Sequence, residues 1–525
     1  MGFYFNPGSE SLEKNVNSRI FIDKSLIMTV LNELFNTADR FLCVSRPRRF
    51  GKTVVGDLVS AFYSRGTDSR PIFEKLKIAQ TPNWDKNLNK INVIQIDMFD
   101  IWNNAECKSD VLPNLTAVVV GEMRKEFPDV IPQGKCTLAD AIKLVYAETG
   151  IPFVVVIDEY DVLIRYPEAL PILPAYLKLL DSLFKAGSTT RAIALAYLTG
   201  IIPIVRDRVQ SKLNNFKEYT MLNPRELAPY IGFTPDEVKG LCDTYNMDYE
   251  ECLRWYDGYH IAPGVSVCNS NSVCEAMLNK RFDDYWTQTG AYTAISDYIA
   301  LNFEGLQDDV KAMMGGQSVA VDTGSFLNTL TEIRKRDDVL TYLIHLGYLA
   351  YDAQTKTCRI PNGEIRLEWV RALDIAPSYA NVMRIVKGSQ QLLADTLAGN
   401  EEAVAEGLDK AHQEATSPLT YNNEGALQAA IGLAYFFATS EYTIIKELPA
   451  GKGYADMAFV PFVKGRPAIV VELKMEGGVD DAMRQIIDRH YADALAPFKG
   501  QVLRVGVSYD KKSKAHTCKI VKGSH

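Results

Sequence analysis

A basic loop between a strand and a helix constrains this chain more than any other feature of its sequence. An apolar run over 41–44 predicts a strand before the loop, and the pattern over 52–63 predicts a helix after it. In this setting the backbone N–H groups of a loop can hold phosphate at the helix N-terminus. A basic surface turn before a helix is the alternative. The loop is Ser45-Arg46-Pro47-Arg48-Arg49-Phe50-Gly51-Lys52-Thr53.

The end of this loop matches the standard phosphate-binding pattern G-x-x-x-x-G-K-[ST]. Gly51, Lys52 and Thr53 fit the pattern, whereas Arg46 stands where its first glycine is expected. Lys52 would neutralise the β- and γ-phosphates of a nucleotide, and Thr53 would offer its hydroxyl to Mg²⁺. We therefore expect the whole loop to bind nucleotide, including Pro47, Arg48, Arg49 and Phe50.

Two carboxylates follow a second strand and support the same interpretation. The continuous apolar run 153–157 predicts a strand buried on both faces, and it ends in Asp158 and Glu159. Asp158 would hold Mg²⁺ and Glu159 would polarise the attacking water. The alternative is a strand that turns acidic because it reaches solvent. A further strand, 192–198, ends in Thr199, which is either a polar sensor of the γ-phosphate or a simple strand-to-loop junction.

The periodicity divides the chain into three segments. Strands alternate with helices over 1–205, which predicts an α/β fold with a largely parallel sheet. The segment 206–395 is predicted to be mostly helical. The segment 396–525 is predicted as a second α/β domain: a helix over 425–439, strands over 442–448, 455–460 and 468–473, a helix over 480–495 and a strand over 502–507.

A third set of residues lies in the last segment. Glu472 and Lys474 share one face of their predicted strand, because side chains alternate. If this strand pairs with the preceding one, Asp456 lies beside Glu472. Two carboxylates would hold Mg²⁺, which stabilises charge on a scissile phosphate, and Lys474 would orient the water. Glu424, before an apolar helix, is an additional acidic candidate. A solvated strand edge is the alternative.

Several segments resemble a bacterial family of AAA-ATPase-like proteins, whose members usually end in a PD-(D/E)XK nuclease-superfamily domain. The similarity lies in Phe21-Ile22-Asp23-Lys24-Ser25, in the loop from Arg46 to Thr53, in Trp255-Tyr256-Asp257-Gly258-Tyr259 and in shorter stretches near 346–349 and 361–365. It covers nearly the whole chain. The family's loop typically contains Arg at the position of Arg46. The resemblance implies an AAA/ASCE-type P-loop domain, a helical middle region and a PD-(D/E)XK-type domain.

The resemblance also extends to the C-terminal residues. Asp456, Glu472 and Lys474 are similar to the PD-(D/E)XK signature, and Gln485 matches a glutamine on the helix after that core. It implies an ATPase that uses ATP and Mg²⁺, with Mn²⁺ as a substitute, and a nuclease that acts on DNA in preference to RNA. A homo-oligomer is a further expectation. The alternatives are an ATP-driven switch whose nuclease-like domain binds nucleic acid without cutting, and a remodelling motor.

Composition and charge narrow the class of protein. A net charge of -8 excludes a uniformly basic nucleic-acid binder, although a local basic cleft is compatible with it. The nine cysteines show no C-x-x-C pair, which is typical of free thiols in a reducing compartment. We see no signal peptide and no apolar run of membrane-spanning length, so we expect a cytoplasmic protein without a membrane partner.

Overall fold

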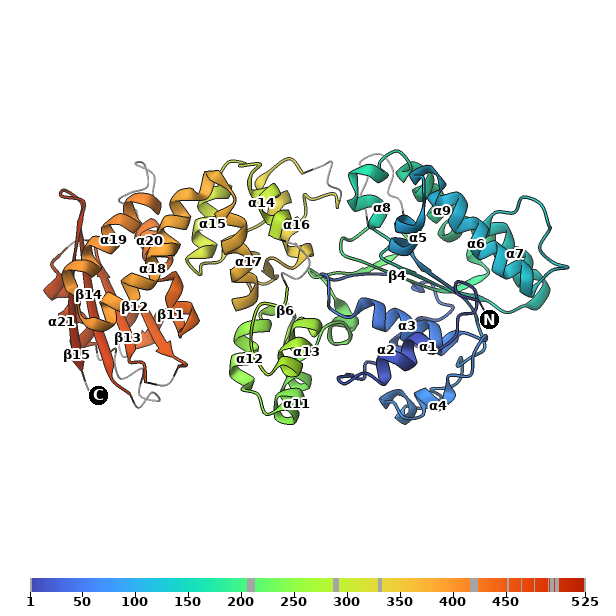
Figure 1. Cartoon of the computed structure of the whole chain (residues 1–525), viewed down its shortest axis with the longest axis horizontal. Helices are drawn as coiled ribbons and strands as arrows, with labels where there is room; N and C mark the ends of the chain where they lie inside the picture. Colours follow the sequence, from blue (N-terminus) through green and yellow to red (C-terminus); the bar gives the residue numbers. More distant parts are fainter. Residues whose placement is uncertain are drawn as a thin grey trace. The chain divides into compact units, whose positions relative to one another are not determined.

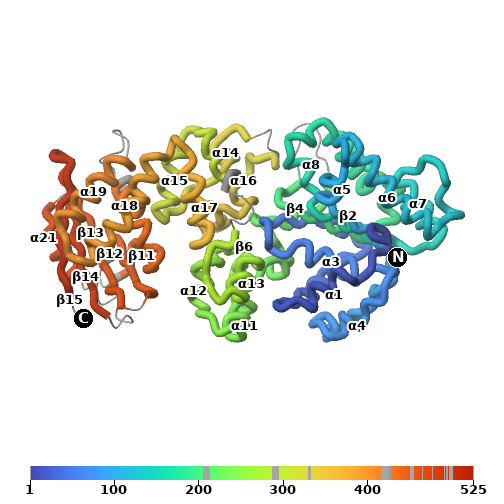
Figure 2. The backbone as a smooth tube through the Cα atoms, in the orientation of Figure 1, coloured from blue at the N-terminus to red at the C-terminus, as the bar shows by residue number. Residues whose placement is uncertain are grey.

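The computed structural model of the chain consists of two compact units, each built from two stretches of sequence (Figure 1, Figure 2). The first unit comprises Met1–Tyr285 and Val321–Asn362, and the second comprises Trp286–Ala320 and Gly363–His525. The structure describes residues 2–204, 213–286, 292–328, 333–415, 424–450, 453–463, 465–475, 477–489, 491, 495 and 500–523.

A five-stranded parallel sheet forms the core of the first unit, with the strand order β2-β3-β4-β1-β5. Three of its strands, β1, β3 and β4, are buried along their whole length, as expected for a parallel sheet covered on both faces. In Figure 1 the helices α1 and α3 lie on one side of this sheet, and α5, α8 and α9 lie on the other. The strands are β1 (Phe41–Ser45), β2 (Asn92–Asp97), β3 (Phe153–Asp158), β4 (Ile193–Gly200) and β5 (Lys217–Tyr219).

The helices around this sheet differ in length. The helix α3 starts at Lys52, directly after the basic loop. The others include α1 (Glu10–Val16), α2 (Ile27–Leu34), α3 (Lys52–Tyr63), α5 (Met98–Asn104), α6 (Val111–Glu126), α7 (Leu138–Thr149), α8 (Val162–Arg165) and α9 (Leu173–Phe184).

The parallel sheet confirms the predicted fold class of the N-terminal region. The three strands predicted from apolar runs are β1, β3 and β4, with ends shifted by one or two residues. The strand β5 was not predicted, because it has only three residues and lies where helices were expected. This strand pairs in parallel with β1 and completes the sheet edge nearest the basic loop.

The structure divides the predicted middle region, 206–395, between the two units. Its first part belongs with the parallel sheet because it buries the apolar residue of the basic loop. The Phe50 ring lies edge-on to Tyr259, with centroids 5.4 Å apart, and the Gly232 N–H donates to the Phe50 carbonyl at 2.9 Å. This part contains α11 (Pro235–Tyr245), α12 (Tyr249–Tyr256), α13 (Ser270–Asn279) and the hairpin β6 (Tyr259–Ala262) and β7 (Val265–Val267). Tyr256 and Tyr259, from the aromatic segment, are buried here.

The second unit combines helices with a five-stranded mixed sheet, in the order β11-β12-β13-β14-β15. Neighbouring strands are antiparallel except β13 and β14, which are parallel and are connected through α21. The strands are β11 (Tyr442–Ala450), β12 (Gly453–Pro461), β13 (Ala468–Lys474), β14 (Val502–Asp510) and β15 (Ala515–Gly523). The helices include α14 (Tyr292–Ile299), α15 (Leu306–Met314), α17 (Gly363–Asp374), α18 (Ala380–Ala398), α19 (Glu401–Ala415), α20 (Glu424–Ala434) and α21 (Val479–Asp488).

The predicted strands of this domain are confirmed, and two helices are shorter than predicted. The apolar helix predicted over 425–439 ends at Ala434, and a 3₁₀ turn, Phe436–Ser440, follows it. The helix predicted over 480–495 ends at Asp488. The C-terminal lysine-rich segment, which was not predicted as a strand, forms the edge strand β15. Within the described ranges, the helices lack the combined length and apolarity needed to cross a membrane.

Candidate functional site

The first candidate site is built around the loop between β1 and α3. Gly51 caps α3 with φ 84°, and Arg49 also has a positive φ, 68°. Glycine adopts this left-handed region at no steric cost, which explains Gly51 at the start of the helix. The left-handed turn brings the loop back over the N-terminus of α3, where the unpaired N–H groups of the first turn favour an anion.

Lys52 is held by the loop that precedes it. Its Nζ donates hydrogen bonds to the carbonyl oxygens of Arg46, at 3.0 Å, and Pro47, at 2.9 Å. The side chain is buried, and burial lowers the pKa of Lys52, while the charges of Glu159 and Asp158 act in the opposite direction. The two hydrogen bonds therefore fix the ammonium against the loop, where it experiences the negative charges of Glu159 and Asp158.

Arg46 stabilises the loop through hydrogen bonds to the ends of neighbouring strands. Its N–H donates to the Gly200 carbonyl at 3.1 Å, which extends the pairing of β1 with β4 by one residue. Its Nη1 donates to the carbonyl oxygens of Ser45, at 2.9 Å, and Tyr219, at 3.2 Å. The guanidinium is fully buried, and burial lowers its pKa to about 10. The guanidinium therefore links the loop to β5, and the predicted contact of Arg46 with nucleotide stays a prediction.

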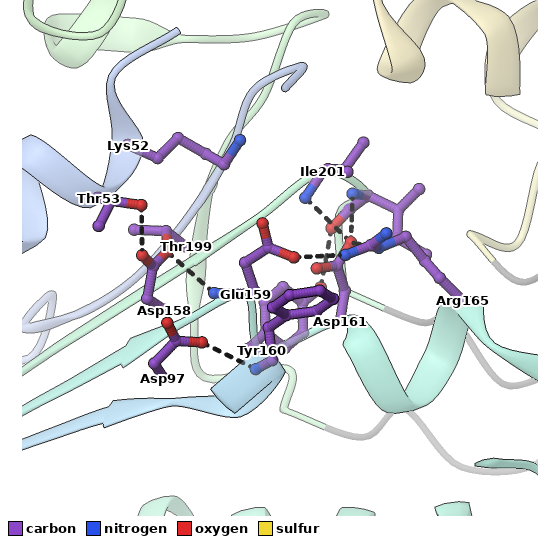
Figure 3. Close-up of polar contacts among 12 residues, drawn as sticks. Lys52, Thr53, Asp97, Asp158, Glu159, Tyr160, Asp161, Arg165, Thr199 and Ile201 are labelled. Atoms are coloured by element: carbon purple, nitrogen blue, oxygen red, sulfur yellow. Dashed lines mark hydrogen bonds and ion pairs between the residues drawn. The ribbon is translucent and has the colours of Figure 1, made fainter. Parts of the chain in front are cut away.

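The side chains of three strands and one helix meet at Asp158 (Figure 3). Thr53 Oγ1 donates to Asp158 Oδ2 at 2.6 Å, and Thr199 Oγ1 donates to Asp158 Oδ1. The contact with Thr199 follows from the strand order, because β4 lies between β1 and β3. Asp97 ends β2 directly opposite Asp158 in the register. Burial, and then the charge of Asp158, raise the pKa of Asp97.

Glu159 lies in an ion-pair network whose other members sequence reasoning missed. Its Oε2 accepts a hydrogen bond from Arg165 Nη2 at 2.8 Å, and Arg165 Nε donates to Asp161 Oδ2 at 2.9 Å. Both partners lie within six residues of Glu159 in the sequence. The motif Asp158-Glu159-Tyr160-Asp161 showed the extra carboxylate, but no spacing rule singles out Arg165.

A cavity of about 610 Å³ adjoins this network. Its lining includes polar and charged residues of the loop and the end of β3, among them Arg48, Arg49, Lys52, Thr53 and Glu159. It also includes apolar and aromatic residues: Ile20, Phe21, Ile22, Tyr230, Phe233 and Cys274. This size and this mixed lining suit a ligand with an aromatic group and a charged tail.

The second candidate site lies on β12 and β13. These strands pair antiparallel with Met457 opposite Val471, and the next position in this register places Asp456 opposite Glu472. Asp456 Oδ2 accepts the Leu473 N–H at 2.7 Å. The register brings the two carboxylates into one row of the sheet.

Lys474 links Glu472 to the helix α21. Its Nζ donates to Glu472 Oε1 at 3.1 Å and to Gln485 Oε1 at 2.5 Å. Gln485 Nε2 in turn donates to the Tyr491 hydroxyl at 2.9 Å. The four predicted residues Asp456, Glu472, Lys474 and Gln485 are therefore gathered at one place, with Lys474 fixed between the carboxylate and the amide.

The surroundings of Glu472 suit a ligand of a cation. It is 2% exposed, and its Oε2 has no hydrogen-bond partner among the described residues. Burial and the charge of Asp456 raise the pKa of Glu472 to about 7, although Lys474 acts in the opposite direction. A divalent ion between the two carboxylates would offset both effects, so these residues fit one.

The carboxylate pair is small for a complete metal centre. In the part of the chain that the structure describes, His, Cys, Asp and Glu side chains do not form a group of three or more suited to a metal ion. Glu424, the additional acidic candidate, is the first residue of α20, but its side chain lies outside the described residues.

Comparison with known proteins assigns both regions. The model of the AAA-ATPase-like family, described as a predicted AAA-ATPase, matches residues 12–210, and the model of the PD-(D/E)XK nuclease superfamily matches residues 422–518. No curated protein matches the chain.

The solved structures that are similar at low identity include two proteins from Aeropyrum pernix. The Aeropyrum pernix ORC1 protein, determined in complex with DNA, is 13% identical over 72% of this chain and 98% of its own, with a TM-score of 0.27. The Aeropyrum pernix ORC2 protein, determined as ADPNP–ADP complexes, is 12% identical over 70% of this chain and 97% of its own, with a TM-score of 0.31. Because these TM-scores are low, the assignment rests on the family models. The chain therefore carries an AAA-ATPase-like domain over residues 12–210 and a PD-(D/E)XK nuclease superfamily domain over residues 422–518.

Proposed function

We propose that the first unit binds and hydrolyses ATP, and that the C-terminal domain is a metal-dependent nuclease that acts on DNA in preference to RNA. The observation that carries the proposal is that Lys52, Thr53 and Glu159 line one cavity of about 610 Å³, with Asp158 bound directly to the Thr53 hydroxyl. Two further expectations belong to the proposal: the chain acts in the cytoplasm, and it forms a homo-oligomer.

Each residue of the first site has a task in this proposal. Lys52 and the N-terminus of α3 hold the phosphates, and the aromatic residues Phe21 and Phe233 enclose the base. Thr53 and Asp158 would hold Mg²⁺, which neutralises phosphate charge when bound. Glu159 accepts the proton of the attacking water, and Thr199 keeps Asp158 oriented through its hydrogen bond.

Calorimetric titration with a non-hydrolysable ATP analogue tests this site. Lys52→Ala should lower the affinity at least about ten-fold, because a buried charge that faces the phosphates is lost. The matched control is Lys125→Ala, an exposed lysine at the end of α6, which should bind as the wild type does. Equal affinity in Lys52→Ala and wild type would exclude the loop as the phosphate site.

The second site offers hydrolysis of a phosphodiester. Asp456 and Glu472 would hold the divalent ion, with Glu424 as an additional acidic group, and the ion supplies charge stabilisation at the phosphate when bound. Lys474 orients the water and stabilises charge in the transition state. Gln485 holds Lys474 in place through its Oε1.

The alternative function is a nucleotide-driven switch whose C-terminal domain binds nucleic acid without cutting it. One observation favours it: within the described residues the carboxylates at this site number two, and Asp456 already accepts a backbone N–H. A domain with one weak ion site could bind a phosphate backbone while its rate of cleavage stays negligible.

Cleavage of plasmid, single-stranded DNA and RNA, with Mg²⁺ or Mn²⁺ and with or without ATP, decides between the two functions. The nuclease proposal expects cleavage by the wild type and loss of cleavage in Asp456→Asn and in Lys474→Ala. A wild type that binds DNA and leaves it intact with either ion would establish the switch. A Lys474→Ala variant that cuts normally would remove Lys474 from the reaction.

A further inference from the structure

A buried ion-pair network joins Glu159 to two residues that the proposal above does not use, Arg165 and Asp161. Arg165 is its centre, with a side chain 8% exposed. One nitrogen, Nη2, lies 2.8 Å from Glu159 Oε2, and a second, Nε, lies 2.9 Å from Asp161 Oδ2. Figure 3 shows Glu159 between the residues of the phosphate loop and Arg165.

Asp161 is the fixed end of this network. Its side chain is fully buried, and its Oδ2 also accepts the N–H groups of Ile201 and Ile202, each at 2.9 Å. Gly200 closes the remaining space, because a Cβ at that position would lie 2.8 Å from Asp161 Oδ1. Asp161 is thereby locked to the end of β4, the strand that carries Thr199.

Because Asp161 is fixed, the rigid guanidinium of Arg165 also restricts where the Glu159 carboxylate can lie. The group is planar and its N–H donors have fixed directions, so a guanidinium held at Nε can present Nη2 in few ways. The charges of Asp161 and Glu159 outweigh the effect of burial and raise the pKa of Arg165, so the arginine stays charged.

Glu159 itself needs support to hold its conformation. Its φ is 48°, in the left-handed region that non-glycine residues rarely adopt. Its N–H donates to Asp158 Oδ1 at 2.9 Å, and its carboxylate is held by Arg165. Asp158 thus fixes the backbone of Glu159, and Arg165 fixes its side chain.

We propose that Arg165 is a positioning residue for ATP hydrolysis, which holds Glu159 toward the cavity, with Asp161 as its anchor. The inference rests on the proposed function, because it requires that Glu159 activates water. It predicts an effect on turnover and little effect on affinity, since Glu159 lines the cavity while Arg165 is buried behind it.

Steady-state ATPase kinetics on the full chain test the inference. Arg165→Met should lower kcat by about ten- to a hundred-fold, the range expected when a reacting group is misplaced by about 1 Å. The KM, and the Kd for a non-hydrolysable analogue, should stay within about two-fold of wild type. Arg165→Lys keeps the charge but not the fork, and should recover part of the rate. The control is Arg191→Met, which removes an exposed arginine of the same unit.

A double variant separates positioning from a general loss of structure. If Arg165 acts through Glu159, then Arg165→Met combined with Glu159→Gln should be no slower than Glu159→Gln alone. Additive losses, an unchanged or raised kcat in Arg165→Met, or a loss that appears only in affinity would each overturn the inference. If Arg165→Met does not fold, Arg165→Lys and Asp161→Asn give the same comparison of kcat with KM.

The outcomes also separate this inference from the proposed function. A wild type that binds no nucleotide overturns both. A wild type that binds ATP and does not hydrolyse it overturns the positioning role and leaves nucleotide binding intact. A wild type that hydrolyses ATP while Arg165→Met matches it overturns the positioning role alone.

Discussion

The burial of Glu472 makes a stability prediction that needs no assumption about substrate. Replacing Glu472 with Gln keeps the size of the side chain and removes a carboxyl whose pKa is raised from 4.5 to about 7. A neutral amide does not carry the cost of holding a negative charge at a buried position beside Asp456. We therefore expect Glu472→Gln to stabilise the C-terminal domain at alkaline pH and to lose its predicted hydrolytic function.

The size and sign of the effect follow from the two pKa values. Below pH 4.5 the carboxyl is protonated in both the folded and the unfolded chain, so it does not lower the free energy of unfolding. Between pH 4.5 and about 7 the unfolded chain releases the proton first, so the free energy of unfolding falls as pH rises. Above pH 7 the loss is complete and amounts to about 3 kcal/mol. Because the shifted pKa already includes the favourable effect of Lys474, the expected gain in Glu472→Gln is also about 3 kcal/mol.

Differential scanning calorimetry of the full chain, in the presence of a chelator, measures this difference. At pH 8 the transition of the C-terminal domain should move upward by about 5 °C or more in Glu472→Gln, and at pH 5 the shift should be small. Glu402→Gln, at an exposed glutamate of α19, is the control and should change neither. A Glu472→Gln variant that is destabilised at pH 8, or stabilised equally at pH 5 and pH 8, would refute the reasoning.

Three further predictions concern the same two sites. Adding Mn²⁺ at pH 7 should raise the melting temperature of the C-terminal domain in wild type and not in Asp456→Asn, measured by calorimetry; equal shifts would place the ion elsewhere. Thr53→Val removes the hydroxyl that donates to Asp158, so Mg²⁺ should no longer strengthen nucleotide binding in titrations, while Thr53→Ser should behave as wild type. Gly200→Ala forces a methyl group against Asp161 Oδ1 and the Tyr160 ring, and should destabilise the first unit by about 1–3 kcal/mol in denaturant unfolding; a neutral effect would show that the space is not tight.

The sequence predicted those parts of both sites that depend on local patterns. Strands buried on both faces appear as continuous apolar runs, so β1, β3 and β4 were visible, and their carboxyl ends marked Asp158 and Thr199. The alternation of side chains along β13 put Glu472 and Lys474 on one face. These signals need only a few neighbouring residues, and the fold adds little to them.

Contacts between segments that are distant in the sequence could not be predicted from local patterns. Arg165 and Asp161 acquire their roles from the Ile201 and Ile202 N–H groups and from Glu159, and this arrangement depends on how β3 and β4 are placed. The strand β5 is too short for a periodic signal. The division of the middle region between the two units depends on which residues pack against Phe50. Only the tertiary structure shows that Tyr259 is one of them.

Arg46 shows how a departure from a motif can be compensated by the fold. The usual first glycine lets the loop turn tightly, whereas Arg46 continues the β1 ladder toward Gly200 and joins β1 to the end of β5. The loop is therefore supported by a side chain where other loops rely on backbone freedom. Arg46 and Lys52 both donate to backbone carbonyl oxygens and are both buried, so two cations lie at and beneath the loop. A ligand with several negative charges offsets such a concentration of positive charge, which is the physical reason to expect a triphosphate at this site.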